Sequence, residues 1–385
     1  MSLPLPLYPL ALAVFAMGTS EFMLAGLLPD LARDLGVGIG AAGSLTSAFA
    51  VGMVVGAPLV AVFARRWSGR AGLLVSVLVF LAAHVVGAVT DSFPVLLLTR
   101  IVAALANAGF LALALAAATA MVPPDRKARA LAVLLGGTTV ATVVGVPGGA
   151  LLGELAGWRA AFWAVAALCV PAAIGILWGG PGGGGRGEQR PLRAEFRVLR
   201  APGLVRVMVL AALVNAATFG SFTYLAPVVT GTAGLSASWV SVALVLFGVG
   251  SFAGVTVAGR LADRHAGRLL AFGGPLLLCG WVVLSGLADR PAGLLGVLLL
   301  QGALCFAVGG TVIAGILYQA GGAPVLAGAY ATAALNVGAV AGPLSAGLVV
   351  ERPTGPFLLS AGLVAAALAF GAVSGSRPGG PASRC

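Results

Sequence analysis

The chain is a succession of long apolar stretches, and the short segments between them hold nearly all of its charge. A helix needs about 20 apolar residues to cross the hydrocarbon core of a bilayer, and each stretch meets that length. Only 9% of the 385 residues are charged, and the mean hydropathy is +1.08. A water-soluble core does not require such a composition. The sequence therefore predicts an integral membrane protein.

Charges, prolines and glycine clusters divide the apolar sequence into twelve expected helices. Their ranges are 8–28, 40–63, 71–90, 94–121, 132–152, 159–178, 207–229, 237–258, 269–287, 292–317, 326–349 and 356–373. The opening residues MSLPLPLYPL carry no Lys or Arg, so the first helix is expected to remain as a span and not to be cleaved as a signal peptide. The expected fold class is an all-α integral membrane protein with twelve transmembrane helices.

Most of the basic residues fall on one side of such a topology. The segments expected inside carry Arg65, Arg66, Arg70, Arg126, Lys127, Arg129, Arg186, Arg190, Arg193, Arg197, Arg200, Arg206, Arg260, Arg264, Arg268, Arg377 and Arg384, whereas the outside loops carry Arg33, Arg159, Arg290 and Arg352. The positive-inside rule then predicts a multi-pass protein of the cell inner or plasma membrane, with both termini cytoplasmic. It also explains the net charge of +11 without nucleic-acid binding.

The two halves of the chain repeat. Shifting residues 49–70 by 198 positions aligns them without a gap on 247–268, with matches that include Phe49/Phe247, Gly52/Gly250, Gly56/Gly254, Arg66/Arg264 and Arg70/Arg268. Tandem repeats of one topology predict two pseudo-symmetric six-helix bundles with a cavity between them, as in transporters.

A glycine-rich and then basic stretch, GGPGGGGRGEQRPLRAEFRVLR, divides the halves. It lacks the Gly-Lys-Ser/Thr of a phosphate-binding loop, so it is interpreted as a linker whose arginines lie along anionic lipid of the inner leaflet. The expected divisions are an N-terminal bundle at 1–178, a cytoplasmic linker at 179–206, a C-terminal bundle at 207–373 and a cytoplasmic tail at 374–385.

Several motifs carry a family resemblance over nearly the whole chain. They are EFMLAGLLPDLARDLG, RIVAALANAGF, PPDRKARALA, GVPGGALLGELAGWRAAF, GRLADR and YATAALNVGAVAGPL. With them the chain resembles the major facilitator superfamily, and within it the twelve-helix drug:proton antiporters, most closely actinobacterial chloramphenicol exporters. The resemblance implies a structural antiporter motif at Gly145, Pro147, Gly148 and Gly149, whose small residues permit close helix approach and bending.

The resemblance also implies a gating loop, Gly259 to Arg264. Asp263 and Arg264 would form a latch at the inner side, since an Asp there can hold a facing helix N-terminus and its own loop arginines. The first copy of the repeat has Arg65 in place of that Asp. The alternative is an ordinary basic loop with an incidental Asp263.

Glu21 is the one acid expected within the membrane, and Arg100 is its candidate partner. Measured from Pro29 and Pro94 at about 1.5 Å per residue, Glu21 lies about 12 Å deep and Arg100 about 9 Å, so the two can meet. Burial favours the neutral acid and a nearby guanidinium favours the carboxylate, which predicts a proton-coupling pair. A static buried ion pair is the alternative. His84 is interpreted as a packing residue, with a proton-relay role as the less favoured alternative.

The candidate substrate-binding residues lie on three expected helices. They are Asn107, Asn215, Phe219, Phe222, Tyr224 and Asn336. Asn215, Phe219 and Phe222 follow helical spacing, and such an aromatic stripe with one amide suits an amphiphilic drug. The alternatives are ordinary packing for the aromatic residues and interhelical hydrogen bonds for the amides.

The sequence thus predicts a proton-coupled antiporter that exports a small neutral drug, with chloramphenicol suggested by the resemblance. A lipophilic cation would usually be matched by a membrane carboxylate, and Glu21, the one acid expected in the membrane, is already assigned to the proton. The partners expected are the drug, protons and membrane lipid, with a monomeric protein and no cofactor. The four scattered cysteines give no metal site. Sugar or metabolite efflux is the alternative within the fold; a membrane-embedded enzyme, which would need clustered acids or histidines, and a passive channel are less favoured.

Overall fold

The computed structural model describes residues 4–63, 69–123, 126–179, 197–321 and 326–375, which are almost entirely helical and contain no β-strand. The helices are α1 (Leu7–Phe22), α2 (Leu24–Asp34), α3 (Ile39–Phe63), α4 (Gly69–Val89), α5 (Phe93–Ala120), α6 (Lys127–Val140), η2 (Ala141–Gly145), α7 (Val146–Ala156), α8 (Trp158–Gly179), α10 (Pro202–Thr223), α11 (Leu225–Pro227), η3 (Val228–Thr232), α12 (Ser238–Gly286), α13 (Pro291–Gln319), α14 (Ala327–Gly347) and α15 (Gly355–Gly375). The all-α prediction is confirmed.

Each expected span corresponds to a helix, to part of one or to consecutive helices. Within the described ranges, ten helical segments are long and apolar enough to cross a membrane, and the pair α1 and α2, bent by 53°, adds an eleventh. The remaining helix, α14, is richer in small and polar residues but packs between α3 and α10. Each of the twelve expected spans therefore has a helical counterpart among the described residues.

The expected loop between the eighth and ninth spans is replaced by helix in the structure. The spans 237–258 and 269–287 are joined in α12, whose backbone leaves helical geometry only at His265, with φ of −134° and ψ of 26°. The connecting residues are mostly Leu, Ala and Arg, which favour helix, so the two spans meet at a tight helical turn in place of a loop.

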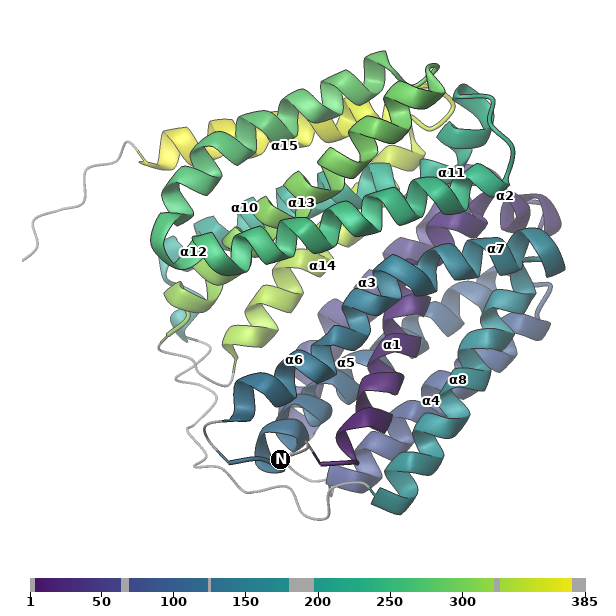
Figure 1. The fold of residues 1–385 in the computed structure, drawn as a ribbon, viewed down its shortest axis with the longest axis vertical. Helices are drawn as coiled ribbons and strands as arrows, with labels where there is room; N and C mark the ends of the chain where they lie inside the picture. The colour runs from purple at the N-terminus through teal and green to yellow at the C-terminus, as the bar shows by residue number, and fades with distance from the viewer. Residues whose placement is uncertain (1–3, 64–68, 124–125, 180–196, 322–325, 376–385) are drawn as a thin grey trace, which may run out of the picture.

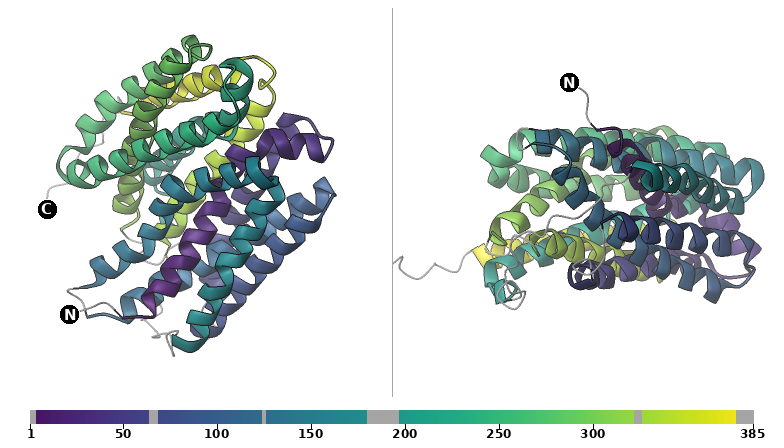
Figure 2. Two further views of the ribbon diagram at one scale, coloured as in Figure 1. Left: turned by 45° about the vertical axis from the view of Figure 1, so that its right-hand side comes forward. Right: turned by 90° about the horizontal axis from the view of Figure 1, so that it is seen from below.

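Two bundles diverge from a common end (Figures 1 and 2). The bundle formed by α1 to α8 has a core that includes Phe80, Phe110 and Phe162, and the bundle formed by α10 to α15 has a core that includes Trp281 and Phe357. The two-bundle architecture is confirmed. The boundaries at 178, 206 and 373 stay predictions, because residues 180–196 and 376–385 lie outside the described part of the chain.

Matched helix contacts bear out the internal repeat. A Cβ atom on Gly52 of α3 would lie 2.6 Å from the carbonyl oxygen of Ile101 in α5, and one on Gly250 of α12 would meet the carbonyl oxygen of Leu299 in α13. Both the glycines and their partners are separated by the 198-residue shift found in the sequence. Glycine therefore allows the same backbone-to-backbone approach in both bundles.

Polar contacts join the bundles at the end where α2 finishes and α3 begins. The Tyr224 hydroxyl donates to the carbonyl oxygen of Pro343 within the C-terminal bundle at 2.9 Å, and it lies 3.4 Å from the carbonyl oxygen of Gly40 in the N-terminal bundle. Ser47 of α3 donates to the carbonyl oxygen of Val340 in α14 at 3.0 Å. From this end the helices spread toward the end at which α1 begins (Figure 1).

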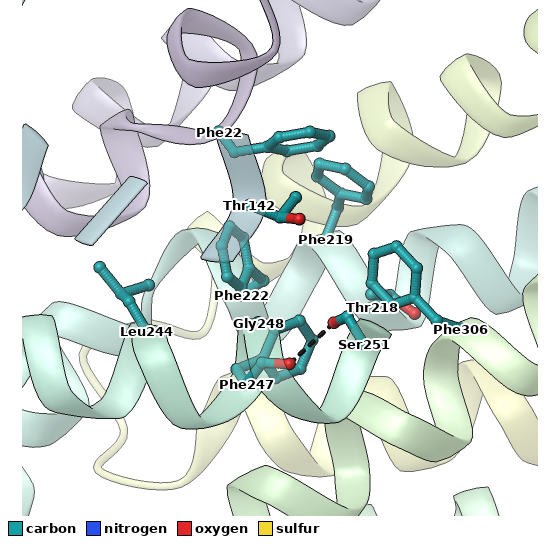
Figure 3. A pocket seen from close by; sticks show the side chains of 10 residues that line it. All are labelled: Phe22, Thr142, Thr218, Phe219, Phe222, Leu244, Phe247, Gly248, Ser251 and Phe306. Carbon is teal, nitrogen blue, oxygen red and sulfur yellow. Dashed lines mark hydrogen bonds between the residues drawn. The ribbon is translucent and has the colours of Figure 1, made fainter. Parts of the chain in front are cut away.

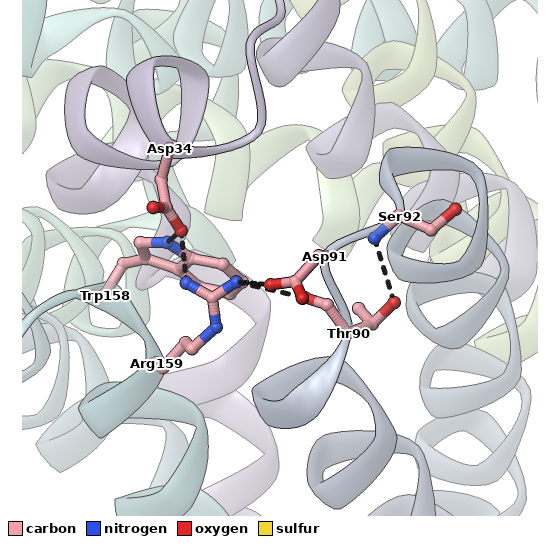
Figure 4. A network of polar contacts seen from close by, with 6 residues as sticks. All are labelled: Asp34, Thr90, Asp91, Ser92, Trp158 and Arg159. Carbon is pink, nitrogen blue, oxygen red and sulfur yellow. Dashed lines mark hydrogen bonds and ion pairs between the residues drawn. The ribbon is translucent and has the colours of Figure 1, made fainter.

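A cluster around Arg159 fixes the same end of the N-terminal bundle (Figure 4). Gly157, with φ of 80°, ends α7 and turns the chain into α8. The Arg159 guanidinium then pairs with Asp34 and, at 2.6 Å, with Asp91, while the indole of Trp158 donates to Asp34 at 2.9 Å. The hydrogen bonds from Arg159 and Trp158 hold the pKa of Asp34 below its ordinary value of 3.8.

Replacing Asp34 by Asn should lower the melting temperature of the purified protein at neutral pH, because the charged acceptor of two donors is lost. Since the pKa of Asp34 is lowered in the folded protein, its contribution is complete above the ordinary value of 3.8 and is lost as the pH falls through the lowered value. The difference in melting temperature between the wild type and D34N should therefore shrink at acidic pH. Thermal unfolding followed by size-exclusion chromatography across pH measures this.

The matched control is Asp30→Asn. Asp30 pairs at 3.0 Å with Arg33 on the same exposed turn of α2, so its removal should change the melting temperature little. Equal losses in the two variants at neutral pH would contradict a specific role for the Arg159 cluster.

Candidate functional site

The site is built around a break in the first span. α1 ends at Phe22 and α2 begins at Leu24, and Pro29, within α2, cannot donate a backbone hydrogen bond to the preceding turn. The last carbonyl groups of a helix lack partners within it and can accept from side chains. Ser20 and Glu21 lie in this last turn of α1, so the break makes backbone acceptors available beside the carboxyl group.

Close approach of the fifth span holds this turn in place. A Cβ on Gly145 would lie 3.1 Å from the Cβ of Thr19. Gly145 ends the π-helical turn η2, and Pro147 follows it, so the turn accommodates the proline ring without interrupting the span. Gly149 approaches Met23 more loosely, at 3.4 Å, whereas Gly148 has open space beside it. Within the expected antiporter motif, Gly145 thus makes the tightest contact.

Glu21 is half-buried and faces α5. The side chain of Asn107 and the charge of Arg100, both on α5, act on its carboxyl group. Asn107 also lies 3.6 Å from the Sδ atom of Met53. Glu21 and Arg100, both in the described part of the chain, form no ion pair in this conformation. The structure therefore brings the expected pair into one region but leaves the carboxyl group free of direct contact with the guanidinium.

The Arg100 guanidinium, only 1% exposed, is instead bonded to α1. Its two terminal nitrogens donate to the hydroxyl and to the carbonyl oxygen of Ser20, each at 2.7 Å. Its carbon lies 4.5 Å from the centre of the Phe49 ring, while its Nε atom has no partner among the described residues. The Ser20 hydroxyl in turn lies 2.7 Å from the Nε2 atom of His84. Arg100 therefore holds the broken end of α1 against α4 and α5.

An aromatic pocket lies between the two bundles (Figure 3). Its space measures about 330 Å³, part of it open to solvent, and it is lined by Phe22, Thr142, Thr218, Phe219, Phe222, Leu244, Phe247, Gly248, Ser251 and Phe306. The rings of Phe22 and Phe219 are 5.6 Å apart, those of Phe222 and Phe247 are 5.0 Å apart, and that of Phe306 lies 6.3 Å from Phe247. Phe22 of α1 thus joins a chain of rings that belongs mainly to the C-terminal bundle.

The hydroxyl groups in the aromatic pocket are already bonded within their own helices. Thr218 donates to Val214 at 3.0 Å, and Ser251 donates to Phe247 at 2.8 Å. Each hydroxyl oxygen keeps acceptor capacity, and none of the ten lining residues is charged. Such a surface suits a small, neutral and partly aromatic molecule.

The other candidate binding residues lie outside the aromatic pocket. The Asn215 amide donates to the carbonyl oxygen of Leu335 at 2.7 Å, and the Asn336 amide donates to that of Thr332 on its own helix at 2.9 Å. Tyr224 is fully buried in the contact between the bundles. Of the expected residues, only Phe219 and Phe222 line the pocket.

The expected gating residues are only partly described. Gly259 is exposed, with open space where a side chain would lie. The side chains of Asp263 and Arg264 lie outside the described residues.

Sequence reasoning missed several residues of the site. Ser20 directly precedes Glu21 and Phe22 directly follows it, whereas Phe247 is the counterpart of Phe49 in the internal repeat. The repeat offered a signal for Phe247, which it aligned with Phe49. No sequence pattern distinguished Thr142 or Phe306 from lipid-facing or packing residues.

Comparisons with known proteins all point to one family of transporters. The family model described as Major Facilitator Superfamily matches residues 10–332. The chain is 63% identical over 372 residues to a chloramphenicol resistance protein of Streptomyces lividans, an alignment that covers 95% of each chain. It is 33% identical over 371 residues to the inner membrane transport protein YdhP of Escherichia coli (strain K12), covering 96% of this chain and 95% of that one.

A solved structure shares the fold. The crystal structure of a bacterial homologue of the human lysosomal transporter Spinster, in an inward-facing and unoccupied conformation, superposes with a TM-score of 0.77 at 18% identity, covering 96% of this chain and 97% of that one.

Replacing Gly145 by Val should disturb the site, because the added side chain meets Thr19 one residue before Ser20. Overpacking of this kind costs about 1–3 kcal/mol. We expect a lower melting temperature and reduced transport by the purified, reconstituted protein. Gly148→Val is the matched control, since the open space beside Gly148 can accept the same side chain. Equal effects of the two substitutions would contradict the close contact between α1 and η2.

Proposed function

Since the chain belongs to the Major Facilitator Superfamily, we propose that it is a proton:drug antiporter that exports a small neutral amphiphilic compound by alternating access. Chloramphenicol is the first candidate substrate, because the relative from Streptomyces lividans, a chloramphenicol resistance protein, is 63% identical over nearly its whole length. The protein is a transporter and not an enzyme.

The aromatic pocket between the bundles is the observation that supports this class of substrate. Five phenylalanine rings and three hydroxyl groups line it without a charged side chain. Aromatic rings bind a nitroaromatic or similar drug through stacking and edge contacts, and hydroxyl oxygens can accept its hydrogen bonds. A sugar would leave many of its hydroxyl groups unpaired against these rings, so sugar efflux fits the pocket less well.

Glu21 is proposed as the proton carrier, with Arg100 as the charge that sets its proton affinity. The carboxyl group is half-buried, lies within the influence of the Asn107 side chain and forms no direct ion pair among the described residues, which leaves it able to bind and release a proton. The absence of contact with Arg100 argues against a static ion pair. Proton binding and drug binding would then favour different conformations, so each ligand promotes release of the other.

The direction of transport follows from the proposed topology. If both termini are cytoplasmic, the bundles are joined at the outer side by the contacts of Tyr224 with Gly40 and of Ser47 with Val340, and they spread toward the cytoplasm. The described conformation is then inward-open, and the aromatic pocket receives drug from the cytoplasm or the inner leaflet. We further propose that the protein works as a monomer in the cell inner or plasma membrane, with its inner basic segments against anionic lipid.

Replacing Glu21 by Gln should strongly reduce proton-driven efflux, because Gln keeps the size and polarity of the side chain but does not titrate. In proteoliposomes we expect about a tenfold loss of pH-gradient-driven chloramphenicol transport. Exchange of labelled for unlabelled chloramphenicol without a gradient should continue and serves as the control for folding. Unimpaired pH-driven efflux in E21Q would overturn the proton role.

Replacing Phe219 by Ala should weaken drug binding while preserving proton coupling, since the ring lines the aromatic pocket and contacts the rings of Phe22 and Phe222. Loss of one aromatic contact is worth about 1 kcal/mol, or about a fivefold weaker affinity. The control is Phe252→Ala on α12, whose ring is 54% exposed and lies outside the pocket. Equilibrium binding of labelled chloramphenicol checks both variants, and equal affinity in F219A and wild type would place the substrate elsewhere.

A further inference from the structure

A buried hydrogen-bond chain runs from α5 through α1 to α4, and the chemistry of its members fixes its direction. An arginine can only donate, so the Ser20 hydroxyl oxygen accepts from Arg100 at 2.7 Å. The hydroxyl proton of Ser20 is then free to point toward the Nε2 atom of His84, 2.7 Å away. On its other side, the Nδ1 atom of His84 lies 2.8 Å from the carbonyl oxygen of Phe80.

These contacts determine the form of the histidine. A carbonyl oxygen can only accept, so Nδ1 carries the proton and donates to Phe80. Nε2 is therefore unprotonated and accepts from Ser20. His84 is a neutral imidazole, 1% exposed, with its ring 4.2 Å from that of Phe80 and 5.7 Å from that of Phe162. A second proton on His84 would remove the acceptor that Ser20 uses and place a further positive charge beside Arg100.

This chain of hydrogen bonds fixes where the Arg100 guanidinium lies. Arg100 has two good anchors, and both belong to Ser20; its Nε atom has no partner among the described residues. The charged group that faces His84 is Arg100 of α5, and the charged group that faces Arg100 is Glu21 of α1. From α8, His84 meets only the ring of Phe162 among the ring contacts of the described residues. The position of one arginine thus sets the electrostatic surroundings of Glu21.

We propose that His84 and Ser20 are positioning residues that hold the Arg100 guanidinium out of contact with Glu21, and so set the pH at which the transporter binds its proton. His84 orients the Ser20 hydroxyl, and the oriented hydroxyl presents its oxygen to Arg100. Without the acceptor on His84, the hydroxyl turns to another partner and the guanidinium is free to approach the carboxylate. This inference rests on the proposed role of Glu21 in proton coupling.

Two substitutions of His84 separate hydrogen bonding from packing. His84→Phe keeps a ring between Phe80 and Phe162 but removes the acceptor, whereas His84→Gln loses the ring and keeps a side-chain oxygen that can accept from Ser20. The measurement is the affinity of the purified protein for labelled chloramphenicol between pH 5 and pH 9, with proton release on drug binding recorded in weakly buffered solution. The pH midpoint reports protonation, which a merely structural role would not move.

We expect the midpoint to fall by about one pH unit in H84F, because a guanidinium that approaches Glu21 favours the carboxylate. In H84Q the midpoint should stay near that of the wild type. Ser20→Ala removes the shared hydroxyl and should lower the midpoint as H84F does. Since His84 acts through Ser20, the double variant S20A/H84F should show no further shift beyond S20A alone.

Each negative result would overturn a different part of the proposal. A wild-type protein whose chloramphenicol affinity and proton release do not depend on pH would overturn the proposed proton coupling itself. A pH-dependent wild type with an unshifted midpoint in H84F and S20A would overturn only the positioning role. Additive shifts in the double variant, or equal shifts in H84F and H84Q, would also overturn it and assign His84 to packing.

Discussion

Arg100 is a permanent cation at the centre of a membrane-spanning bundle, and the local structure is arranged to accommodate it. Burial of an unpaired guanidinium in low dielectric is costly, so its donors require strong acceptors. The break after Phe22 provides one, the carbonyl oxygen of Ser20, and the Ser20 hydroxyl provides another. The face of the Phe49 ring adds a cation–π contact. The bend in the first span and the placement of the arginine therefore depend on each other.

The internal repeat shows how the two halves have diverged around this arrangement. The 198-residue shift places Thr218 where the first half has Ser20, Phe219 where it has Glu21, and Leu298 where it has Arg100. Without the arginine, Thr218 donates to the carbonyl oxygen of Val214 on its own helix. Phe219 and Phe247 then contribute rings to the aromatic pocket, whereas the related Phe49 covers Arg100. One half provides the polar cluster and the other provides most of the apolar surface.

The sequence was sufficient for the fold because its signals are local or repeated. Span length, charge between spans and a gapless repeat specify twelve helices in two bundles without any knowledge of packing. The rotation of each helix is a different matter, since one residue turns a side chain by about 100° about the axis. Asn215 and Phe219 are four residues apart on α10, yet Asn215 bonds to Leu335 while Phe219 lines the pocket. Tyr224 follows the end of α10, so helical spacing did not apply to it.

π-helical turns add a further shift in helix register that no sequence pattern predicted. In η2 the extra residue alters the register between Thr142 and Pro147, which turns Thr142 toward the aromatic pocket while Gly145 still packs on Thr19. A regular α-helix through the same residues would turn Thr142 differently relative to Gly145, so the two residues would not make both contacts as they do here. Small residues predicted close approach in this span, but only the packed structure selects Gly145 over Gly148.

Glu21 and Phe22 are consecutive residues, and together they connect the two functional regions. The carboxyl group of Glu21 faces Asn107 and the charge of Arg100, while the ring of Phe22 contacts Phe219 and Phe222 of the opposite bundle. Both residues lie in the last turn of α1, directly before the 53° bend. Backbone hydrogen bonds hold such a turn together, so displacement of the Phe22 ring by a bound molecule would shift the carboxyl group relative to Arg100. In the proposed mechanism, reciprocal coupling between drug and proton requires no long pathway, because a single helical turn would contact both ligands.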